Sequence, residues 1–503
     1  MSISRKYKPY DPYTSYLLPL NLRDWLPENH LAQFIIDTVN ELDLSEFYHP
    51  SRSTKGQPAY DPKMLVSLLL YSYAIGLPSS RKIEQKTYED IAYRIISGNQ
   101  HPDHDTISDF RKDNLKAFSN LFLKVLELAH KLNLVSLGHV ALDGTKIKAN
   151  ASKHKAMSYD RMIKKETELK EKISFLLKEA ESVDNKEDKL YGKGKNLLTL
   201  PEELKYHKER LGKIREAKAA LEKEALIKNE KNEFERKNDI NKIDKSNKNN
   251  ESDNKNNNKD SNSNNISSIN ESVNNINTES ILPKPTDQIN FTDPESKIML
   301  DSGNKAFIQG YNAQAAVDSF NQIILAAEVT RETNDKLQVK PMISKVKKNI
   351  KKYPDVVTAD SGYYSETNVT WLEKKHIDPY IATGRMKHDD PFSIKCNDNA
   401  VLTEEKKKLN KNNKKKDKKD KKDIMTLKLR TEKGKEIYSR RKTIVEPVFG
   451  QIKGTKNYRQ FLLRGINKVN SEWKLICLTH NLTKIFRRLN LNKQVDINFS
   501  YQY

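Results

Sequence analysis

The sequence predicts an α/β protein with a mixed sheet and an all-helical region in front of it. Between Leu31 and Leu134 the apolar residues recur at three- and four-residue spacing, which is the period of an amphipathic helix. From His139 onward, short apolar segments compatible with strands alternate with helical segments. We therefore expect a helical N-terminal domain followed by a domain in which helices cover a sheet.

The helical region contains several helices of moderate length. The helical patterns are HLAQFIIDTVNEL, PKMLVSLLLYSYAIGL, KIEQKTYEDIAYRII and AFSNLFLKVLELAHKL. Gly76-Leu77-Pro78-Ser79 and His101-Pro102-Asp103 separate these patterns. Residues of these types end one helix and cap the next, so we expect helix boundaries at both places.

The sequence from His139 onward predicts the strands of the sheet. HVALDGTKIKA predicts a strand that ends near Asp143. The other expected elements are a hairpin of Gly310–Asp318 and Gln322–Thr330, a helix from about Asp335 to Lys352, a strand Asp355–Asp360, a helical stretch ending near Lys375 and a strand Pro379–Thr383. A ribonuclease-H-like fold has this order of strand, hairpin, helix, strand, helix and strand.

Two insertions interrupt the predicted sheet domain. Residues Ser158 to Lys237 are strongly charged with sparse apolar positions, which predicts two long helices forming a hairpin. Asn238 to Thr286 is rich in Asn, Lys and Ser, and we expect it to be disordered. The expected domains are a helical domain 1–135, sheet-domain segments 136–154 and 296–384, a hairpin and disordered insertion 155–295, a Lys-rich insertion 385–430, and helices 431–503 that carry Glu446.

Composition limits the partner and the compartment. The 503 residues carry a formal net charge of +22, which favours a polyanionic partner such as nucleic acid. The chain has two cysteines, Cys396 and Cys477, too few for a disulfide framework or a cysteine-rich zinc site. The longest apolar stretch, Met64–Leu77, is too short to span a membrane, and the N-terminus lacks a signal-peptide pattern. We expect a cytoplasmic protein.

Three acidic residues are the candidate catalytic group. Asp143 and Asp360 each follow a predicted strand, and Glu446 lies in a predicted helix that we expect to cross the same edge of the sheet. Three carboxylates in one place repel one another unless cations bind between them. Mg²⁺ fits such a site, with Mn²⁺ as a substitute, and two ions can promote in-line phosphoryl transfer.

Each acid also has a simpler interpretation. Asp143-Gly144 alone is typical of a hairpin turn. Asp360-Ser361-Gly362 alone is typical of a helix cap or loop, and Glu446 alone of a solvated helix residue. His101, His104 and His480 are interpreted as packing or capping residues and not as metal ligands.

The helix around Glu446 carries more information. At about 100° per residue, Lys442, Glu446, Gly450 and Lys453 share one face, which places one acid among bases. The glycine leaves room for a ligand, and the lysines are candidates for contacts to DNA phosphates. Close packing at the glycine and plain solvation of the lysines are the alternatives.

The sequence from Tyr438 to Lys453, YSRRKTIVEPVFGQIK, with EWKLICLTHNL after it, resembles the C-terminal signature of insertion-sequence transposases of the DDE superfamily, specifically insertion-sequence family 1182. GQPAYDPKMLVSLLLYSYAIGLPSSRKIEQ, VALDGTKIKANAS, GYNAQAAVD and TADSGYY resemble other blocks of that family in the same order. The resemblance covers most of the chain outside the insertions. It implies that Asp143, Asp360 and Glu446 are the acidic triad.

The chain departs from the family pattern at two places. The superfamily places Tyr, Arg, Glu and Lys at fixed spacing, and here Glu446 and Lys453 fit while Tyr438 and Arg441 lie one position too far upstream. Lys442 stands at the expected Arg position. We still include Tyr438 and Arg441 among the candidate DNA contacts. Some relatives carry a cysteine cluster before the Glu, but here only Cys396 remains, so no structural zinc is expected.

The expected function is a DNA transposase that binds the terminal inverted repeats of its element and the target DNA. It would perform Mg²⁺-dependent cleavage and strand transfer as a homodimer, because two element ends must be brought together. One alternative is a catalytically silent, transposase-derived DNA-binding protein. A second is recombination through a covalent tyrosine intermediate, for which the sequence offers no organised Arg/His set.

Overall fold

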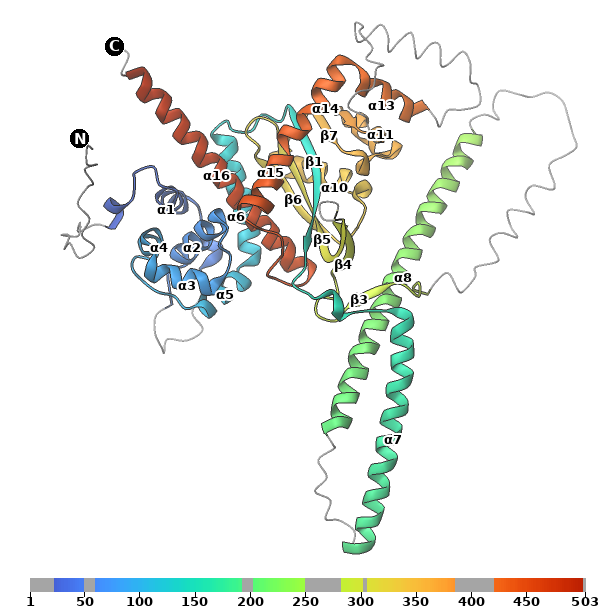
Figure 1. Cartoon of the computed structure of the whole chain (residues 1–503). Coiled ribbons are helices and arrows are strands. Elements are labelled where there is room, and N and C mark those ends of the chain that lie inside the picture. Colours follow the sequence, from blue (N-terminus) through green and yellow to red (C-terminus); the bar gives the residue numbers. More distant parts are fainter. Residues whose placement is uncertain are drawn as a thin grey trace, which may run out of the picture. The chain divides into compact units, whose positions relative to one another are not determined.

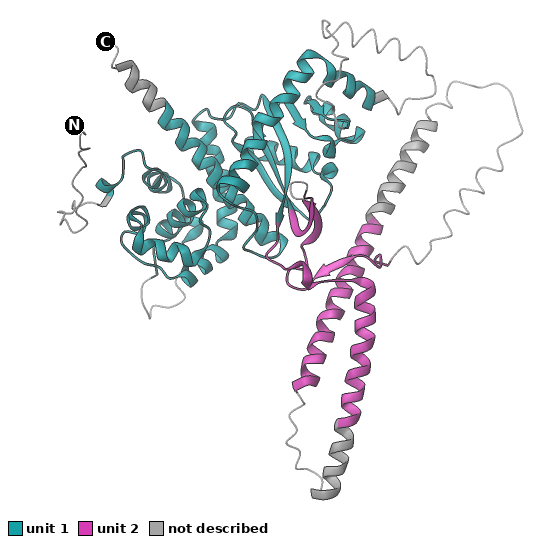
Figure 2. Cartoon of the chain, viewed as in Figure 1, with its two compact units in different colours: residues 1–147, 312–503 teal, residues 148–311 magenta. Residues whose placement is uncertain are grey.

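The computed structural model describes residues 22–48, 59–191, 202–248, 282–301, 305–384 and 420–500. They fall into two compact units (Figure 2). Unit 1 consists of residues 1–147 and 312–503, and unit 2 of residues 148–311. The candidate acids all belong to unit 1.

The N-terminal part of unit 1 is all-helical, as the sequence predicts (Figure 1). Its α-helices are α1 (Leu31–Glu41), α2 (Pro62–Ile75), α3 (Ser80–Glu89), α4 (Ile91–Ile96), α5 (His104–Asp113) and α6 (Leu115–Lys131). Gly76 ends α2 with a φ of 83°, and the Asp103 side chain caps α5 by accepting a hydrogen bond from the Thr106 amide. Both boundaries lie at the predicted breakers.

A six-stranded mixed sheet follows, in the order β4-β5-β1-β7-β8, with β6 paired to β5. Its strands are β1 (His139–Lys148), β4 (Lys297–Asp301), β5 (Ala306–Asp318), β6 (Ile324–Thr330), β7 (Val356–Ala359) and β8 (Asp378–Ile381). β1, β7 and β8 run parallel, whereas β4, β5 and β6 form antiparallel pairs. Mixed topology with this element order is a ribonuclease-H-like arrangement, which confirms the expected fold class.

Two strand predictions need correction. β1 does not end near Asp143 but continues to Lys148, because Asp143-Gly144 lies within an extended strand beside β5 instead of forming a turn. The hairpin β5–β6 is present, but β5 begins at Ala306 and pairs there with β4, which the sequence analysis missed. The short strands β2 (Ala156–Ser158) and β3 (Gln288–Asn290) were also missed.

Helices of the second half cover the sheet. α10 (Val339–Ile350) and α16 (Ile466–Ser500) pack on β6, and α11 (Glu366–Lys374) and α13 (Asp420–Arg430) pack on β8. α16 also packs on α6 and α2, so one helix joins the helical region to the sheet. The buried Trp473 of α16 donates from its indole nitrogen to the Gln314 carbonyl of β5, at 3.0 Å.

Unit 2 contains the predicted helical hairpin, formed by α7 (Tyr159–Tyr191) and α8 (Glu202–Lys248). Met162, Leu211 and Ile214 are among the buried residues between the two helices. α8 extends to Lys248, so the expected disorder does not begin at Asn238, because the charged helical pattern carries on past that residue.

Parts of the predicted insertions lie outside the described residues, namely 249–281 and 385–419, which include Cys396. Asp420–Arg430, at the end of the predicted Lys-rich insertion, is helix α13. Among the described residues, no helix is long and apolar enough to cross a membrane.

The three candidate histidines pack as the sequence analysis interpreted them. His101 stacks on Tyr88 with ring centroids 3.9 Å apart, and the Nδ1 atom of His104 lies 2.7 Å from a Glu84 carboxylate oxygen. His480 is buried in α16, and its Nε2 lies 3.1 Å from the Gln322 carbonyl oxygen.

His480 makes stability depend on pH. Burial lowers its pKa to about 3, and the neighbouring Lys456, Lys484 and Arg487 add to the effect. A lowered folded-state pKa means that the unfolded chain binds this proton first, so stability falls as pH drops below the ordinary histidine pKa of about 6.5. We expect the wild type to lose about 1.4 kcal/mol per pH unit more than His480→Gln between about pH 6 and 4. Urea unfolding across this range measures the difference, and equal slopes would contradict the burial of a neutral His480.

Candidate active site

Strand register brings the two candidate aspartates together. β1 and β7 are parallel neighbours in the register His139↔Val356, Val140↔Val357 and Ala141↔Thr358. Two residues further along, the same register sets Asp143 opposite Asp360. Side chains at matching positions of adjacent strands point to the same face and lie about 5 Å apart. The two carboxylates therefore form a pair at the end of β7.

Different local structures hold the two aspartates. Asp143 lies inside β1, and its Oδ1 accepts a hydrogen bond of 2.9 Å from the Gly144 amide. Asp360 directly follows β7 and caps the short helix η6 (Ser361–Tyr363), because its Oδ1 accepts from the Gly362 amide at 2.9 Å. The cap interpretation of Asp360 is thus correct, and it is compatible with a role beside Asp143.

Glu446 begins α15 (Glu446–Gly450), which follows α14 (Glu432–Ile444) and leads into the π-helix η7 (Gln451–Thr455). Its side chain is 49% exposed. Arg441 joins it to the aspartate pair: Nη1 lies 3.1 Å from an Asp143 oxygen and Nη2 lies 3.4 Å from a Glu446 oxygen. The helix prediction for Glu446 is confirmed.

Burial and mutual repulsion disfavour charge on the aspartates. The pKa of Asp143 is raised to about 6, chiefly by burial; Arg441 opposes the shift, and the carboxylates of Asp360 and Asp335 contribute to it. Burial also raises the pKa of Asp360. A site that places several carboxylates in low dielectric gains from a cation, and Arg441 supplies one.

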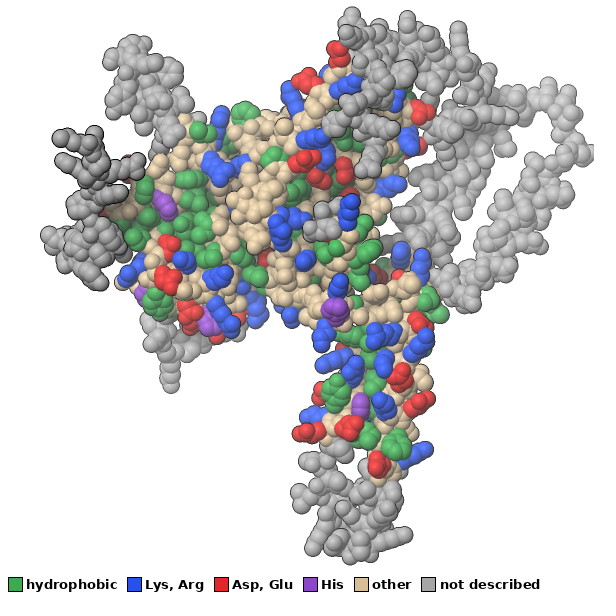
Figure 3. All heavy atoms as spheres, in the orientation of Figure 1, with side chains coloured by type: hydrophobic (Ala, Val, Ile, Leu, Met, Phe, Trp, Pro, Cys, Tyr) green, Lys and Arg blue, Asp and Glu red, His purple; other side chains and the backbone are tan. Residues whose placement is uncertain are grey.

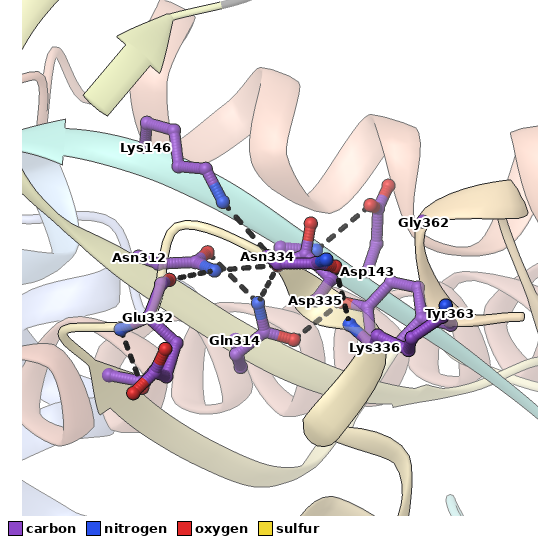
Figure 4. Close-up of polar contacts among 12 residues, drawn as sticks. Asp143, Lys146, Asn312, Gln314, Glu332, Asn334, Asp335, Lys336, Gly362 and Tyr363 are labelled. Atoms are coloured by element: carbon purple, nitrogen blue, oxygen red, sulfur yellow. Dashed lines mark hydrogen bonds and ion pairs between the residues drawn. The ribbon is translucent and has the colours of Figure 1, made fainter. Parts of the chain in front are cut away.

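Asp335 is a fourth acid that the sequence analysis missed. It begins the short helix η5 (Asp335–Leu337) after β6, and its Oδ1 accepts hydrogen bonds from Asn312 at 2.6 Å and Gln314 at 2.7 Å (Figure 4). Lys146 of β1 lies 3.4 Å from the same oxygen. A Cβ on Gly362 would lie 3.1 Å from Asp360 Oδ1 and 3.6 Å from Asp335 Oδ2. Asp335 thus flanks Asp360.

Gln314 organises the side chains around Asp335. It lies on β5, donates to Asn312 at 2.9 Å and to Asp335, and accepts a hydrogen bond of 2.5 Å from the Tyr363 hydroxyl (Figure 4). The signal for this network was available in the sequence: Asn312 and Gln314 are polar residues at alternate positions among the small apolar residues of the strand segment YNAQAAV. Alternate positions share one face of a strand.

The predicted face around Glu446 is present only in part, because Lys442 lies in α14, Glu446 begins α15 and Lys453 lies in the π-helix η7. Lys442, Glu446 and Gly450 are exposed, and the position of a Cβ on Gly450 has no neighbouring atom within 4 Å. Lys453 instead contacts the sheet, since its Nζ donates to Thr145 Oγ1 and to the Lys146 carbonyl oxygen, each at 3.1 Å.

Tyr438 and Arg441 both lie at the acids despite their shifted spacing. Burial raises the pKa of the Tyr438 hydroxyl, Arg441 opposes the shift, and the charges of Asp360 and Asp143 add to it. Arg441 forms ion pairs with Asp143 and Glu446, so in this structure the predicted DNA contact lies against the acids.

The residues fit a hard divalent cation by their chemistry. Asp143, Asp360, Asp335 and Glu446 supply carboxylate oxygens, the ligands that Mg²⁺ prefers. Among the described residues, however, no three His, Cys, Asp or Glu side chains lie close enough together to hold a metal ion. The structure brings Asp143 and Asp360 together, whereas Glu446 reaches them through Arg441.

Comparison with known families agrees with this geometry. A family model described as Transposase DDE domain matches residues 287–482, and one described as Transposase domain (DUF772) matches residues 20–113. Neither the comparison with curated proteins nor that with solved structures gave a match. The chain is a transposase of the DDE superfamily. These two domains in this order are typical of the transposases that insertion sequences encode, and the chain is an insertion-sequence transposase.

The matched residues include Asp360 and Glu446, while Asp143 lies between the two matches. The assignment of Asp143 therefore rests on the register of β1 and β7 and on its contact with Arg441.

Proposed function

We propose that this transposase, of the insertion-sequence family 1182 type, binds the terminal inverted repeats of its element as a homodimer. It then cleaves and joins DNA with Mg²⁺ held by Asp143, Asp360 and Glu446. The observation that carries the proposal is the half-buried pair of Asp143 and Asp360 on adjacent parallel strands, with Arg441 linking Asp143 to Glu446.

Each residue has a separate task in this proposal. Bound Mg²⁺ would activate the attacking oxygen and stabilise the leaving oxygen of an in-line transfer. Asp143 and Asp360 supply ligand oxygens from rigid strand positions, and Asp335 orients the neighbouring side chains through Asn312, Gln314 and Lys146. When the ion pairs of Arg441 with the acids break, its guanidinium binds a DNA phosphate. The planar arrangement of its N–H donors matches the phosphate oxygens.

The basic surface supports DNA as the partner. In the view of Figure 3, Lys and Arg side chains are spread over both units, mixed with acidic ones on the α7–α8 hairpin. Lys442 is exposed four residues before Glu446, and we place it near a phosphate of the scissile bond. We place Lys442, Lys453, Arg441 and Tyr438 in the DNA-contacting part of the site.

The decisive experiment measures Mg²⁺-dependent nicking of labelled DNA that contains the sequences flanking the gene. Wild type is compared with Asp360→Asn, and with Asp355→Asn as a control at the exposed start of the same strand. We expect nicks at the repeat ends with wild type and Asp355→Asn, and none with Asp360→Asn or without divalent cation. If the wild type and both variants bind the DNA but none of them cleaves it, the result would favour a catalytically silent DNA-binding descendant. A covalent protein–DNA adduct would favour a tyrosine intermediate.

A further inference from the structure

The chain beyond Glu446 is unusually basic. Residues 447–495 contain ten Lys or Arg and one acid, Glu472, so 10 − 1 = +9 of the net charge of +22 comes from 49 residues. Glu472 is 2% exposed and accepts hydrogen bonds from the backbone amides of Leu462 and Leu463. The Glu472 carboxylate is therefore bound to backbone amides inside the protein and does not neutralise the basic surface of this segment.

Three of these bases form a cluster, which we call the α16 cluster: Lys456, Lys484 and Arg487. Lys456 directly follows η7, while Lys484 and Arg487 lie three residues apart on one face of α16. Lys456 is 8% exposed, and its Nζ has one hydrogen-bond partner, Thr483 Oγ1 at 3.4 Å. Lys484 donates to the side-chain oxygen of Gln322, and Arg487 is exposed.

The α16 cluster lacks negative charge. The pKa values of Lys456 and Lys484 are both lowered to about 8, chiefly by burial and also by repulsion from Arg487. None of the ion pairs among the described residues involves Lys456, Lys484 or Arg487. A nearly buried ammonium with one neutral partner leaves donors unsatisfied, which is costly unless an anion completes the site.

The cluster also lies close to the catalytic helix. Lys453, which contacts β1 two and three residues beyond Asp143, precedes Lys456 by three residues, less than one helical turn of about 5 Å. That separation is smaller than the major groove of DNA, which is about 12 Å wide. A duplex bound at the acids is wide enough to span this separation.

We propose that the α16 cluster binds a phosphate group of the DNA backbone. The proposal rests on the proposed function, because it takes DNA as the ligand. The phosphate would accept hydrogen bonds from Lys456 and Lys484 and pair with Arg487 at the exposed end. Such a contact positions the duplex without reading its sequence.

The test replaces Lys456 and Lys484 by Met, singly, with Lys468→Met as a control at an exposed position in the first turn of α16. Met keeps the apolar stem and removes the repelled charge. We expect each cluster variant to raise the midpoint of thermal unfolding, to weaken binding of a short duplex about tenfold at 0.1 M salt, and to reduce the salt slope by about one. Lysines with a structural role alone would instead lower the midpoint and leave the slope unchanged, which would overturn the proposal.

A second probe distinguishes the ligands. Inorganic phosphate should stabilise the wild type more than either cluster variant. If inorganic phosphate stabilises the wild type but the cluster variants keep the wild-type salt slope for DNA binding, the cluster is an anion site that DNA does not use, and the assignment is overturned.

If the wild type binds and cleaves DNA while the variants match it, this site fails and the proposed function stands. If the wild type does not bind DNA, the proposed function itself fails.

Discussion

Replacing Glu446 by Gln is expected to reduce DNA cleavage about 10³-fold or more, equivalent to about 4 kcal/mol of transition-state stabilisation. Gln keeps the size of the side chain but removes its charge, and a neutral amide is a much weaker ligand for Mg²⁺ than a carboxylate. The side chain is half-exposed, so its charge contributes little to folding. DNA binding should stay within about twofold of wild type, because the phosphate contacts that dominate affinity remain.

The matched control for this variant is Glu436→Gln. Glu436 lies on α14, ten residues before Glu446, and pairs with Arg440 on the exposed surface of the same helix. Single-turnover cleavage and gel-shift titration of all three proteins provide the comparison. A Glu446→Gln protein that cleaves at the wild-type rate would remove Glu446 from the site, and equal losses in both variants would indicate a general effect of charge on the segment formed by α14 and α15.

The sequence predicted the aspartate pair because its signals are local. A short apolar segment ends at Asp360, and another contains Asp143, so each acid could be assigned to a strand without knowledge of the partner strand. The end of β1 could not be predicted in this way. Gly144 has the chemistry of a turn, and only the packing of β5 against β1 shows that the chain stays extended there.

Asp335 and Arg441 were harder to place for different reasons. Asp335 follows β6 by five residues in a polar stretch, where an acid is ordinary, and its role arises from Asn312 and Gln314 on another strand. Arg441 stands one residue outside the family spacing, but a long side chain compensates for such a shift and still reaches both Asp143 and Glu446. Contacts between distant segments determined both results.

Replacing Gly144 by Ala is expected to damage the site without removing any acid. A Cβ at this position would lie 2.2 Å from Gln314 Nε2 and 2.9 Å from Asn312 Oδ1, so these side chains must move. Gln314 is 1% exposed and hydrogen-bonds to Asp335 and Tyr363, so its displacement leaves buried polar groups without partners. We expect the free energy of unfolding to fall by about 1–3 kcal/mol. Cleavage should fall about 10²-fold, because a shift of about 1 Å in catalytic groups has this effect.

A control and a compensating variant separate the two effects of this substitution. Gly138→Ala adds the same methyl group immediately before β1, where a Cβ meets no atom within 4 Å, and should change neither stability nor cleavage. Gly144→Ala combined with Gln314→Ala relieves the closer of the two collisions, the one with Gln314, but still removes the hydrogen bond to Asp335. The double variant should therefore be more stable than the sum of the single changes predicts, while its cleavage stays low. Recovery of cleavage along with stability would show that Gln314 and Asp335 serve folding alone, and that the acids need no support from β5.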